Sequence, residues 1–186
     1  MWLKPGLVLA SKDFGGKRVV FRFPKMSDAT LAMRYINALI DEGARILLTK
    51  RITLAEEKKW LKRTISSLKN GTTLTAFGIC GKEICAIGGV DRRFSSNAAD
   101  THVASYHISV AKAFRRLGLA AYISELVFQL AKKEWKTQIL KSSYVADNDA
   151  SAALHRKLGF KLVGKIPKAT KYGNKYIDEV ICYKEI

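Results

Sequence analysis

The stretch AFRRLGLAAY, residues 113–122, places two arginines directly in front of a helix start built from small residues. The first turn of a helix already carries partial positive charge from its unpaired N–H groups, so Arg115 and Arg116 are unfavourable there without an anionic partner. Gly118 and Ala120 let a ligand approach the main chain closely. The pattern predicts a phosphate or pyrophosphate site; the alternative is a solvated arginine pair on a surface turn.

The elements that precede this stretch begin with a strand and two helices. KRVVFRFP, residues 17–24, is rich in β-branched and aromatic residues and ends at a proline, which predicts a strand. A helix is expected at 27–43, with Ser27 as its cap, and a second at 53–71. Thr53 and Glu56 have the spacing of a capping box at the start of the second helix.

The rest of the chain continues the alternation. TLTAFGIC and EICAIGGVDRR, residues 73–80 and 83–93, are strand-like runs about a Gly-Lys turn, which predicts an antiparallel hairpin. The stretch quoted first opens a long helix, and a shorter helix is expected at 147–159. Further strands are expected at 104–110, 138–145, 160–166 and 175–185. This order predicts a mixed α/β fold with a single central, mostly antiparallel sheet of six to seven strands, flanked by about four helices.

The composition is that of one globular domain with a strong positive charge. The chain has 186 residues, of which 48% are hydrophobic and 10% aromatic, which excludes an intrinsically disordered protein. Thirty-three Lys and Arg against sixteen Asp and Glu give a net charge of +17. A charge of this size attracts polyanions or acidic partners, but it carries no information on the fold.

The cysteines indicate a reducing compartment. Cys80 and Cys85 flank the predicted turn, where strands of equal length would set Cys80 opposite Glu83 and Cys85 opposite Gly78. The two thiols would not face each other, so a disulfide is disfavoured and reduced cytoplasmic thiols are expected. The three cysteines have no metal-ligand spacing, and no metal is expected.

The first sixteen residues are expected to form an extension outside the main domain. Residues 1–16 contain a short apolar run that Lys4 and Pro5 interrupt, too short for a membrane span and poorly shaped as a signal peptide. We therefore expect a cytoplasmic protein without membrane association. Its domain occupies residues 17–186, behind an N-terminal extension that has room for an extra strand.

Two motifs in the second half of the chain, separated by one predicted helix and one strand, carry a family resemblance. ISVAKAFRRLGLA, residues 108–120, resembles a strand ending in Val followed by Arg/Gln-x-x-Gly-x-Gly/Ala. NDASAALHRKLGF, residues 148–160, resembles a second signature with Asn, a small residue, Leu-Tyr and Gly-Phe. Together they are similar to the GNAT superfamily of acetyl-CoA-dependent N-acetyltransferases, over roughly residues 17–184. His155 stands where the family usually has Tyr.

The resemblance implies an acyl-CoA N-acyltransferase fold, with a splayed parallel strand pair in the middle of the sheet, and acetyl-CoA as acyl donor. The CoA pyrophosphate is expected on the amides at the start of the helix, and the peptide-like pantetheine arm is expected to add to the preceding strand. Asn148 would hydrogen-bond the arm, cap the following helix, or do both. The expected cofactor-binding residues are Ile108, Val110, Lys112, Arg115, Arg116, Leu117, Gly118, Leu119, Ala120, Asn148 and Ser151.

The implied reaction is direct attack of a neutral amine on the thioester, which needs a base for the amine and a proton donor for the sulfur. His155 is a candidate acid in the family's tyrosine position, with a surface histidine as the alternative. Tyr144 is a second candidate acid, although strand tyrosines are more often packed. His107 is the first candidate base, since its strand offers no carboxylate. Ordered waters are the alternative.

The acceptor is not identified by any motif. Between Arg156 and Lys175 the chain has seven Lys or Arg residues and no acid, which is a solvated face or a surface for CoA phosphates, an acidic peptide or RNA. The resemblance implies that Tyr172, Tyr176 and Asp178 lie near the acceptor. We expect a monomer or homodimer that acetylates a protein amine or a small amine. The alternative is a non-catalytic nucleic-acid- or ribosome-binding module with the same fold.

Overall fold

Eight strands form one sheet in a computed structural model that describes residues 3–92 and 99–186. Their order across the sheet is β1-β2-β3-β4-β5-β6-β8-β7, and every neighbouring pair is antiparallel except β5 and β6. The mixed α/β prediction is confirmed, with more strands than the six to seven expected. The strands are β1 (Val8–Phe14), β2 (Lys17–Arg22), β3 (Thr73–Cys80), β4 (Glu83–Asp91), β5 (Val103–Val110), β6 (Ile139–Val145), β7 (Lys161–Tyr172) and β8 (Lys175–Glu185).

The added strand is β1, in the N-terminal stretch where an extra strand was allowed for. Phe14 pairs with Lys17, so Gly15 and Gly16 form a two-residue turn, and both have positive φ (56° and 76°). Two glycines between strand-like runs are the usual signal for such a turn, because other residues rarely adopt two left-handed conformations in succession. Met1 and Trp2, and Arg93 at the end of the predicted 83–93 run, lie outside the described residues.

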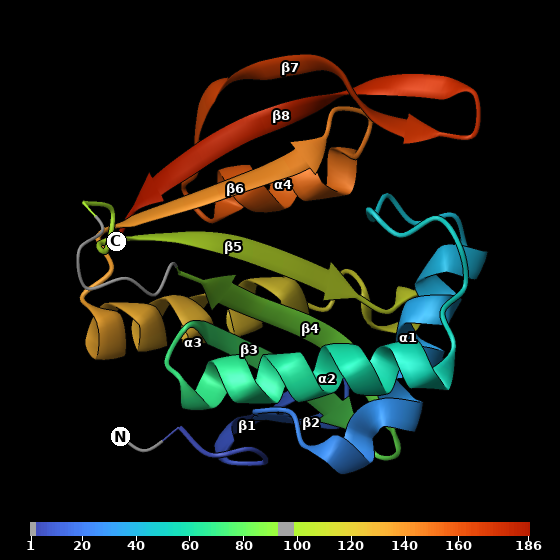
Figure 1. Cartoon of the computed structure of the whole chain (residues 1–186), viewed down its shortest axis with the longest axis vertical. Helices are drawn as coiled ribbons and strands as arrows, with labels where there is room; N and C mark the ends of the chain where they lie inside the picture. The colour runs from blue at the N-terminus through green and yellow to red at the C-terminus, as the bar shows by residue number, and fades with distance from the viewer. Residues whose placement is uncertain (1–2, 93–98) are drawn as a thin grey trace.

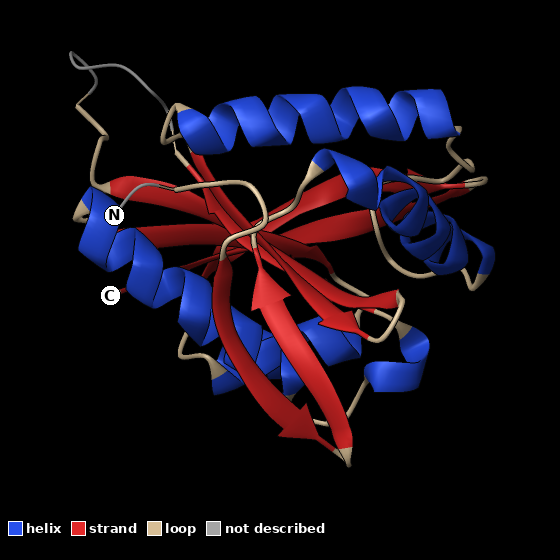
Figure 2. Cartoon of the chain, turned by 90° about the horizontal axis from the view of Figure 1, so that it is seen from below, coloured by secondary structure: helices blue, strands red, loops and turns tan. Residues whose placement is uncertain are grey.

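Helices cover both faces of the sheet (Figure 2). In Figure 1, α2 lies in front of the sheet and α3 behind it. The apolar sides of α1 and α2 enclose Phe77 and Ile84, whereas α3 packs on the larger core cluster of the other face. The helices are α1 (Ala29–Asp41), α2 (Leu54–Lys69), α3 (Leu119–Trp135) and α4 (Asp149–Lys157), with 3-10 turns at Met26–Asp28 and Lys112–Phe114. No helix among the described residues is long and apolar enough to cross a membrane.

The helix starts follow the predicted capping chemistry in one case and depart from it in the other. At α2, the Thr53 hydroxyl accepts the Glu56 N–H at 3.3 Å and the Glu56 carboxylate accepts the Thr53 N–H at 2.7 Å, which confirms the capping box. Ser27 as the cap of α1 is wrong. The 3-10 turn places Asp28 there instead, and its carboxylate is held by the Arg22 guanidinium at 2.6 Å.

The hairpin of β3 and β4 has the predicted turn but not the predicted register. Cys80 pairs with Glu83 as expected, whereas Gly78 pairs with Ala86 rather than Cys85. Cys85 is the extra residue of a β-bulge, and its thiol donates to the Gly78 carbonyl at 3.1 Å. Counting residues from the turn assumes a regular ladder, so it could not anticipate a bulge.

The parallel pair opens almost at once. β5 and β6 pair only at Val103–Ile139, Ala104–Leu140 and Ser105–Lys141, and then diverge (Figure 1). On their other sides, β5 pairs with β4 from Ser105 to Val110, and β6 pairs with β8 over its whole length. The splayed pair expected from the family resemblance is therefore present, and it leaves the second half of β5 with a free edge toward β6.

Candidate functional site

A pocket of about 500 Å³ lies where β5 and β6 separate. Its walls are the end of β5, the start of α3, one side of α4, and residues 44–46 after α1. Lys112 and Leu117 do not line it; Leu117 lies next to Gly15 instead. The other predicted cofactor-binding residues do line it: Ile108, Val110, Arg115, Arg116, Gly118, Leu119, Ala120, Asn148 and Ser151.

The start of α3 presents free amides to this pocket. Gly118, the N-cap residue, has φ 83°, and no side chain caps the helix. Arg116 also has positive φ, 66°, which costs a non-glycine residue about 1 kcal/mol or more. Among the described residues, no main-chain carbonyl accepts from the N–H groups of Arg116, Leu117 or Gly118. Successive free amides at a helix start form an anion-binding concavity, so the strain is concentrated at a site suited to phosphate.

The two arginines have different partners. Arg115 donates through Nε to the Val110 carbonyl at 3.1 Å, and its guanidinium forms an ion pair with Glu42 after the end of α1. Arg115 therefore already has an anionic partner within the chain, and it braces the turn between β5 and α3. The Arg116 guanidinium is exposed and has no hydrogen-bond or ion-pair partner among the described residues. Arg116 is the arginine available to a bound anion.

The free edge of β5 supplies main-chain groups to the same pocket. The Tyr106 carbonyl accepts from Ser142 of β6 at 3.2 Å, whereas the Ala111 N–H donates to Cys85 of β4. Main-chain groups alternate in direction along a strand, so those of Ile108 and Val110 point with Tyr106 toward the β6 side. Beyond Ser105, β6 is too far away to pair with them. An extended, peptide-like ligand can add to this edge.

The start of α4 closes the pocket from the other side. The Asn148 side-chain oxygen accepts the Ser151 N–H at 3.0 Å, so the expected capping role is present. Its amide nitrogen has no partner among the described residues and remains able to donate. Lys157, one turn after Ala153 on the lining side of α4, adds positive charge.

His155 is buried beneath α4 and does not line the pocket. His155 is only 4% exposed, so the alternative of a surface histidine is wrong. Nδ1 lies 2.8 Å from the Ser151 carbonyl, which can only accept, so Nδ1 carries a proton and Nε2 faces the Ser142 hydroxyl at 2.9 Å. Burial lowers the pKa of His155. The Tyr144 ring packs on it, with ring centres 4.9 Å apart, and Tyr144 does not line the pocket either.

His107 faces the opposite side of the sheet from Tyr106. The Tyr106 hydroxyl is hydrogen-bonded to Ser124 of α3, whereas His107 lines a second cavity of about 530 Å³ between α2 and strands β3 to β5. His107 Nδ1 lies 3.3 Å from an Asp91 carboxylate oxygen. A carboxylate accepts, so Nδ1 carries the proton and Nε2 of the neutral ring keeps its lone pair. That nitrogen is able to take a proton from a substrate.

The surroundings of His107 hold Asp91 ionised and leave room for the ring. Burial raises the pKa of Asp91, but the hydrogen bonds from His107 and Thr73 act in the opposite direction, and the pKa falls below its ordinary value. A Cβ on Gly89 would lie 2.8 Å from His107 Nε2 and 2.9 Å from the Thr75 Cα. Glycine at this position is what lets the imidazole lie across β4.

Side chains from three segments meet across the open end of the sheet. Arg45 makes two hydrogen bonds to Asp147, of 3.0 and 2.8 Å, and lies over the Tyr172 ring. The Tyr172 hydroxyl donates to the Ile46 carbonyl at 2.8 Å. Tyr176 is 55% exposed and Asp178 accepts the Lys168 N–H at 3.0 Å, so Asp178 supports β7. Of the three expected acceptor-side residues, Tyr172 is the one in contact with the rim at Ile46.

Comparison with known protein families identifies the family of this chain. Residues 18–161 match the acetyltransferase (GNAT) domain family. The chain belongs to the GNAT family. As a GNAT acetyltransferase it uses acetyl-CoA as acyl donor, and among the described residues no cluster of side chains could hold a metal ion.

Solved structures share the fold of this GNAT acetyltransferase at low sequence identity. A RimL ribosomal L7/L12 α-N-protein acetyltransferase in complex with coenzyme A has TM-score 0.81 and 14% identity, covering 97% of this chain and 98% of its own. A ribosomal-protein-S5-alanine acetyltransferase from Vibrio fischeri has TM-score 0.79 and 18% identity, covering 95% and 96%. The microcin C7 self-immunity acetyltransferase MccE, in complex with acetyl-CoA and AMP, has TM-score 0.76 and 16% identity, covering 94% of each chain. No curated protein sequence matches the chain significantly.

Three residues of this GNAT acetyltransferase that lie near the pocket or near His107 were not predicted from the sequence: Gly89, Asp91 and Ser109. Asp91 and Gly89 lie one strand away from His107, and only the register of β4 with β5 brings them together. Ser109 lines the pocket, and its hydroxyl oxygen accepts from Tyr35 at 2.8 Å. The one available signal was the Gly-Gly-Val-Asp ending of β4, where glycine in a strand marks a close approach.

Proposed function

We propose that this GNAT acetyltransferase transfers acetyl from acetyl-CoA to a primary amine of a polypeptide by direct nucleophilic attack. The observation that carries the proposal is the pocket that joins free amides at the start of α3 to the free edge of β5. A phosphate-binding end and a peptide-binding edge in one cavity match the two chemically different halves of CoA. The ribosomal-protein acetyltransferases among the similar structures support a protein amine as acceptor.

The diphosphate of the donor is assigned to the amides from Arg116 to Ala120, with charge-assisted contacts from Arg116 and Lys157. Arg115 is proposed to act through the turn that it braces rather than through direct contact. The pantetheine arm is assigned to the main-chain groups of Ile108 and Val110, with the free amide of Asn148 as a further donor. This arrangement brings the thioester toward Ser109, close to the end of β5.

His107 is the proposed general base. His107 and Ser109 lie on the same face of β5, two residues and therefore about 7 Å apart along the strand. The amine nitrogen forms the new C–N bond, the C–S bond breaks, and the amine proton passes to His107 Nε2 directly or through water. Asp91 holds the required tautomer from the other side of the ring. The Ser109 hydroxyl, whose oxygen already accepts from Tyr35, keeps its own proton to donate toward the leaving thiolate.

The proposal is tested by turnover of the purified chain with acetyl-CoA and a panel of peptides with free N-termini, measured as CoA thiol release and peptide mass. We expect H107N to lower kcat by about a hundredfold or more, the usual contribution of a general base, with the KM for acetyl-CoA unchanged. R116A is expected to raise the KM for acetyl-CoA by about tenfold without a change in melting temperature.

Arg115 supplies the matched control on the cofactor side. R115A is expected to lower the melting temperature as well, because it removes an ion pair to Glu42 and a bond to the Val110 carbonyl. If acetyl-CoA gives neither turnover nor thermal protection at millimolar concentration, the assignment of the pocket is wrong. Equal effects of R116A and R115A on KM and stability would remove the distinction between the two arginines.

A further inference from the structure

The second cavity, between α2 and the sheet, has the chemistry of an anion site. Its volume is about 530 Å³, and Trp60, Arg63, Thr64 and Ser67 of α2 line it at the spacing of one helix face. Its floor is the strand row that contains Thr75, Gly89 and His107, since Thr75 pairs with Gly89 and Gly89 with His107. The proposed base, His107, therefore lines this cavity and belongs to β5, the strand to which the acyl donor is assigned.

Two arginines that line the cavity, Arg63 and Arg92, have no acidic partner among the described residues. Arg63 is exposed and makes no ion pair or hydrogen bond with any described residue. Arg92 donates through Nε to the Gly71 carbonyl at 2.9 Å and lies over the Trp135 ring, which fixes it without neutralising it. Among the described residues of the lining, Asp91 is the only one with a carboxylate, and it interacts with His107 and Thr73. Net positive charge remains.

Buried hydroxyls add polar character where the fold needs none. Thr73 and Thr75, 4% and 3% exposed, lie on the cavity side of β3, with their hydroxyl oxygens 2.9 Å apart. Valine would fill the same space, and burying a hydroxyl costs stability unless it is hydrogen-bonded. The two threonines share one hydrogen bond, which uses the proton of one hydroxyl, and the Thr73 hydroxyl is also hydrogen-bonded to the Asp91 carboxylate. The same face of β3 is apolar two residues on, at Phe77, so the polar floor is confined to this cavity.

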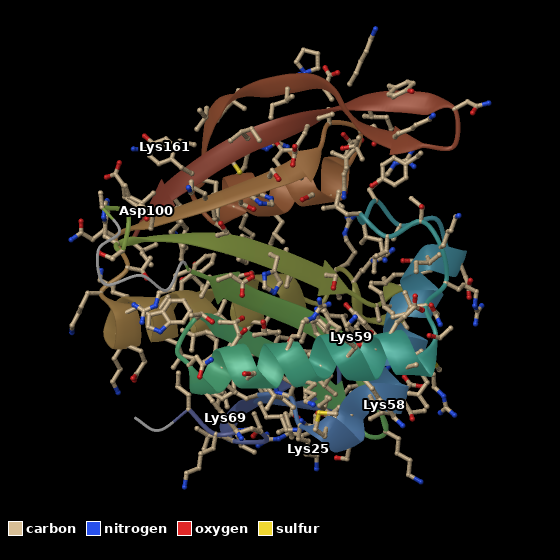
Figure 3. The ribbon with its side chains drawn as sticks, viewed as in Figure 1. Lys25, Lys58, Lys59, Lys69, Asp100 and Lys161 are labelled. Atoms are coloured by element: carbon tan, nitrogen blue, oxygen red, sulfur yellow. The ribbon has the colours of Figure 1, made fainter. Side chains whose placement is uncertain are left out.

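The outer surface of α2 strengthens the positive field. Lys58, Lys59 and Lys69 all lie on α2 and are exposed (Figure 3). They do not line the cavity, and helical periodicity sets Lys58 and Lys69 on the side of α2 opposite to it, so they act only through the long-range field of the molecule. The total charge of +17 acts in the same direction.

We propose that this cavity binds an anionic group of the acceptor, a carboxylate near the amine that is acetylated, through Arg63 and Arg92. The inference rests on the proposed function, because it takes His107 as the base. An acidic side chain in the first residues of a peptide would reach the guanidinium groups while the N-terminal amine faces His107. The preferred acceptor is thus a polypeptide with Glu or Asp next to its N-terminal residue.

The experiment compares peptides that differ only by Glu, Gln or Lys at the second position. We expect kcat/KM to be at least about tenfold higher for Glu than for Gln, and lowest for Lys, as for a charged hydrogen-bonded pair. R63A should reduce kcat/KM for the Glu peptide to that of the Gln peptide and leave the Gln value unchanged. K59A, on the same helix but outside the lining, is the matched control and should keep the preference.

A wild-type enzyme without a preference for Glu, or an R63A effect of equal size on all three peptides, would overturn the inference while the proposed function stands. Binding of N-acetylated peptides, measured by fluorescence anisotropy, gives a readout that does not need turnover. Glu-dependent binding that R63A removes, in a protein that acetylates none of the peptides, would support the anion site and reject the proposed function.

Discussion

At the scale of single residues, His155 shows that a residue in a family motif need not lie in the functional site. The motif resemblance made it a candidate acid, but both of its ring nitrogens face partners within the chain, and it does not line the pocket. It closes an aromatic cluster with Tyr106, Tyr144 and Phe160. A residue in this environment contributes chiefly to packing and hydrogen bonding beneath α4.

We therefore expect H155F to keep kcat within about threefold and to lower the free energy of unfolding by about 1–2 kcal/mol, through the lost hydrogen bonds. Burial lowers the pKa of His155 from its ordinary value of 6.5. The unfolded chain then binds the proton more readily, so this contribution to stability is present above pH 6.5 and is lost as the pH falls below it. Denaturant unfolding between pH 5 and 8 measures the slope, which H155F should reduce.

The catalytic reading of His155 predicts a different result. A fall in kcat of a hundredfold in an H155F protein of unchanged stability would assign the acid to His155 after all. The KM for acetyl-CoA in the same preparation is the control for a folded pocket.

At the scale of elements, α2 carries two adjacent glutamates with opposite behaviour. Glu56 completes the capping box with Thr53, and hydrogen bonds from the Thr53 N–H and hydroxyl lower its pKa. Glu57, the next residue, faces inward and is 5% exposed, and burial raises its pKa to about 7. One glutamate favours the folded state as an anion, the other as a neutral acid.

The two glutamates predict opposite pH dependence. The Glu57 contribution falls as the pH rises from about 4.5 to about 7, because the folded state resists ionisation. E57Q should therefore stabilise the protein at pH 8, by at most about 3 kcal/mol, and have little effect at pH 5. E56Q, the matched control, should destabilise at pH 8 and have less effect as the pH falls toward and below 4.5. Thermal or urea unfolding of the three proteins at both pH values measures this. A destabilised E57Q at pH 8 would show that the Glu57 carboxylate has a stabilising partner.

The elements also show what the sequence can predict. Strands and helices with local signals, such as the capping box at Thr53 and the turn at Gly81, were predicted close to their bounds. The residues expected at the cofactor site, apart from Lys112 and Leu117, line one pocket, because residues 108–120 and 148–160 each form a continuous motif around one helix start. The missed features depend on register between distant strands. Asp91 meets His107 only because β4 pairs with β5, and Cys85 bulges for reasons that no local count reveals.

At the scale of the whole molecule, the sheet consists of two parts joined by a short parallel ladder. Strands β1 to β5 form one part and β6, β8 and β7 the other, and three residue pairs of β5 and β6 connect them. The pocket occupies the gap that follows. The run of seven basic residues from Arg156 to Lys175 lies in the second part, along α4 and β7 and at the start of β8.

The contacts across the open end compensate for the short ladder. Arg45 belongs to the first part, whereas Asp147 and Tyr172 belong to the second, and both contact residues 45–46. The Arg45 and Asp147 side chains are 34% and 30% exposed, so the ion pair is only partly shielded from solvent. We expect a coupling energy of about 0.5–1 kcal/mol in a double-mutant cycle of R45A and D147A.

A small coupling energy can still control the width of the gap, because the β5–β6 ladder ends far from these contacts. We expect R45A and Y172F each to raise amide hydrogen exchange in residues 44–48 and 170–176, with exchange in β3 and β4 unchanged. Both variants should weaken acetyl-CoA binding by a few-fold, since Arg45 and Ile46 line the pocket. R51A is the control, because Arg51 pairs with Asp41 within the same part. Unchanged exchange in R45A and Y172F would mean that the short ladder alone fixes the gap, and that the contacts at its open end follow from the fold rather than maintain it.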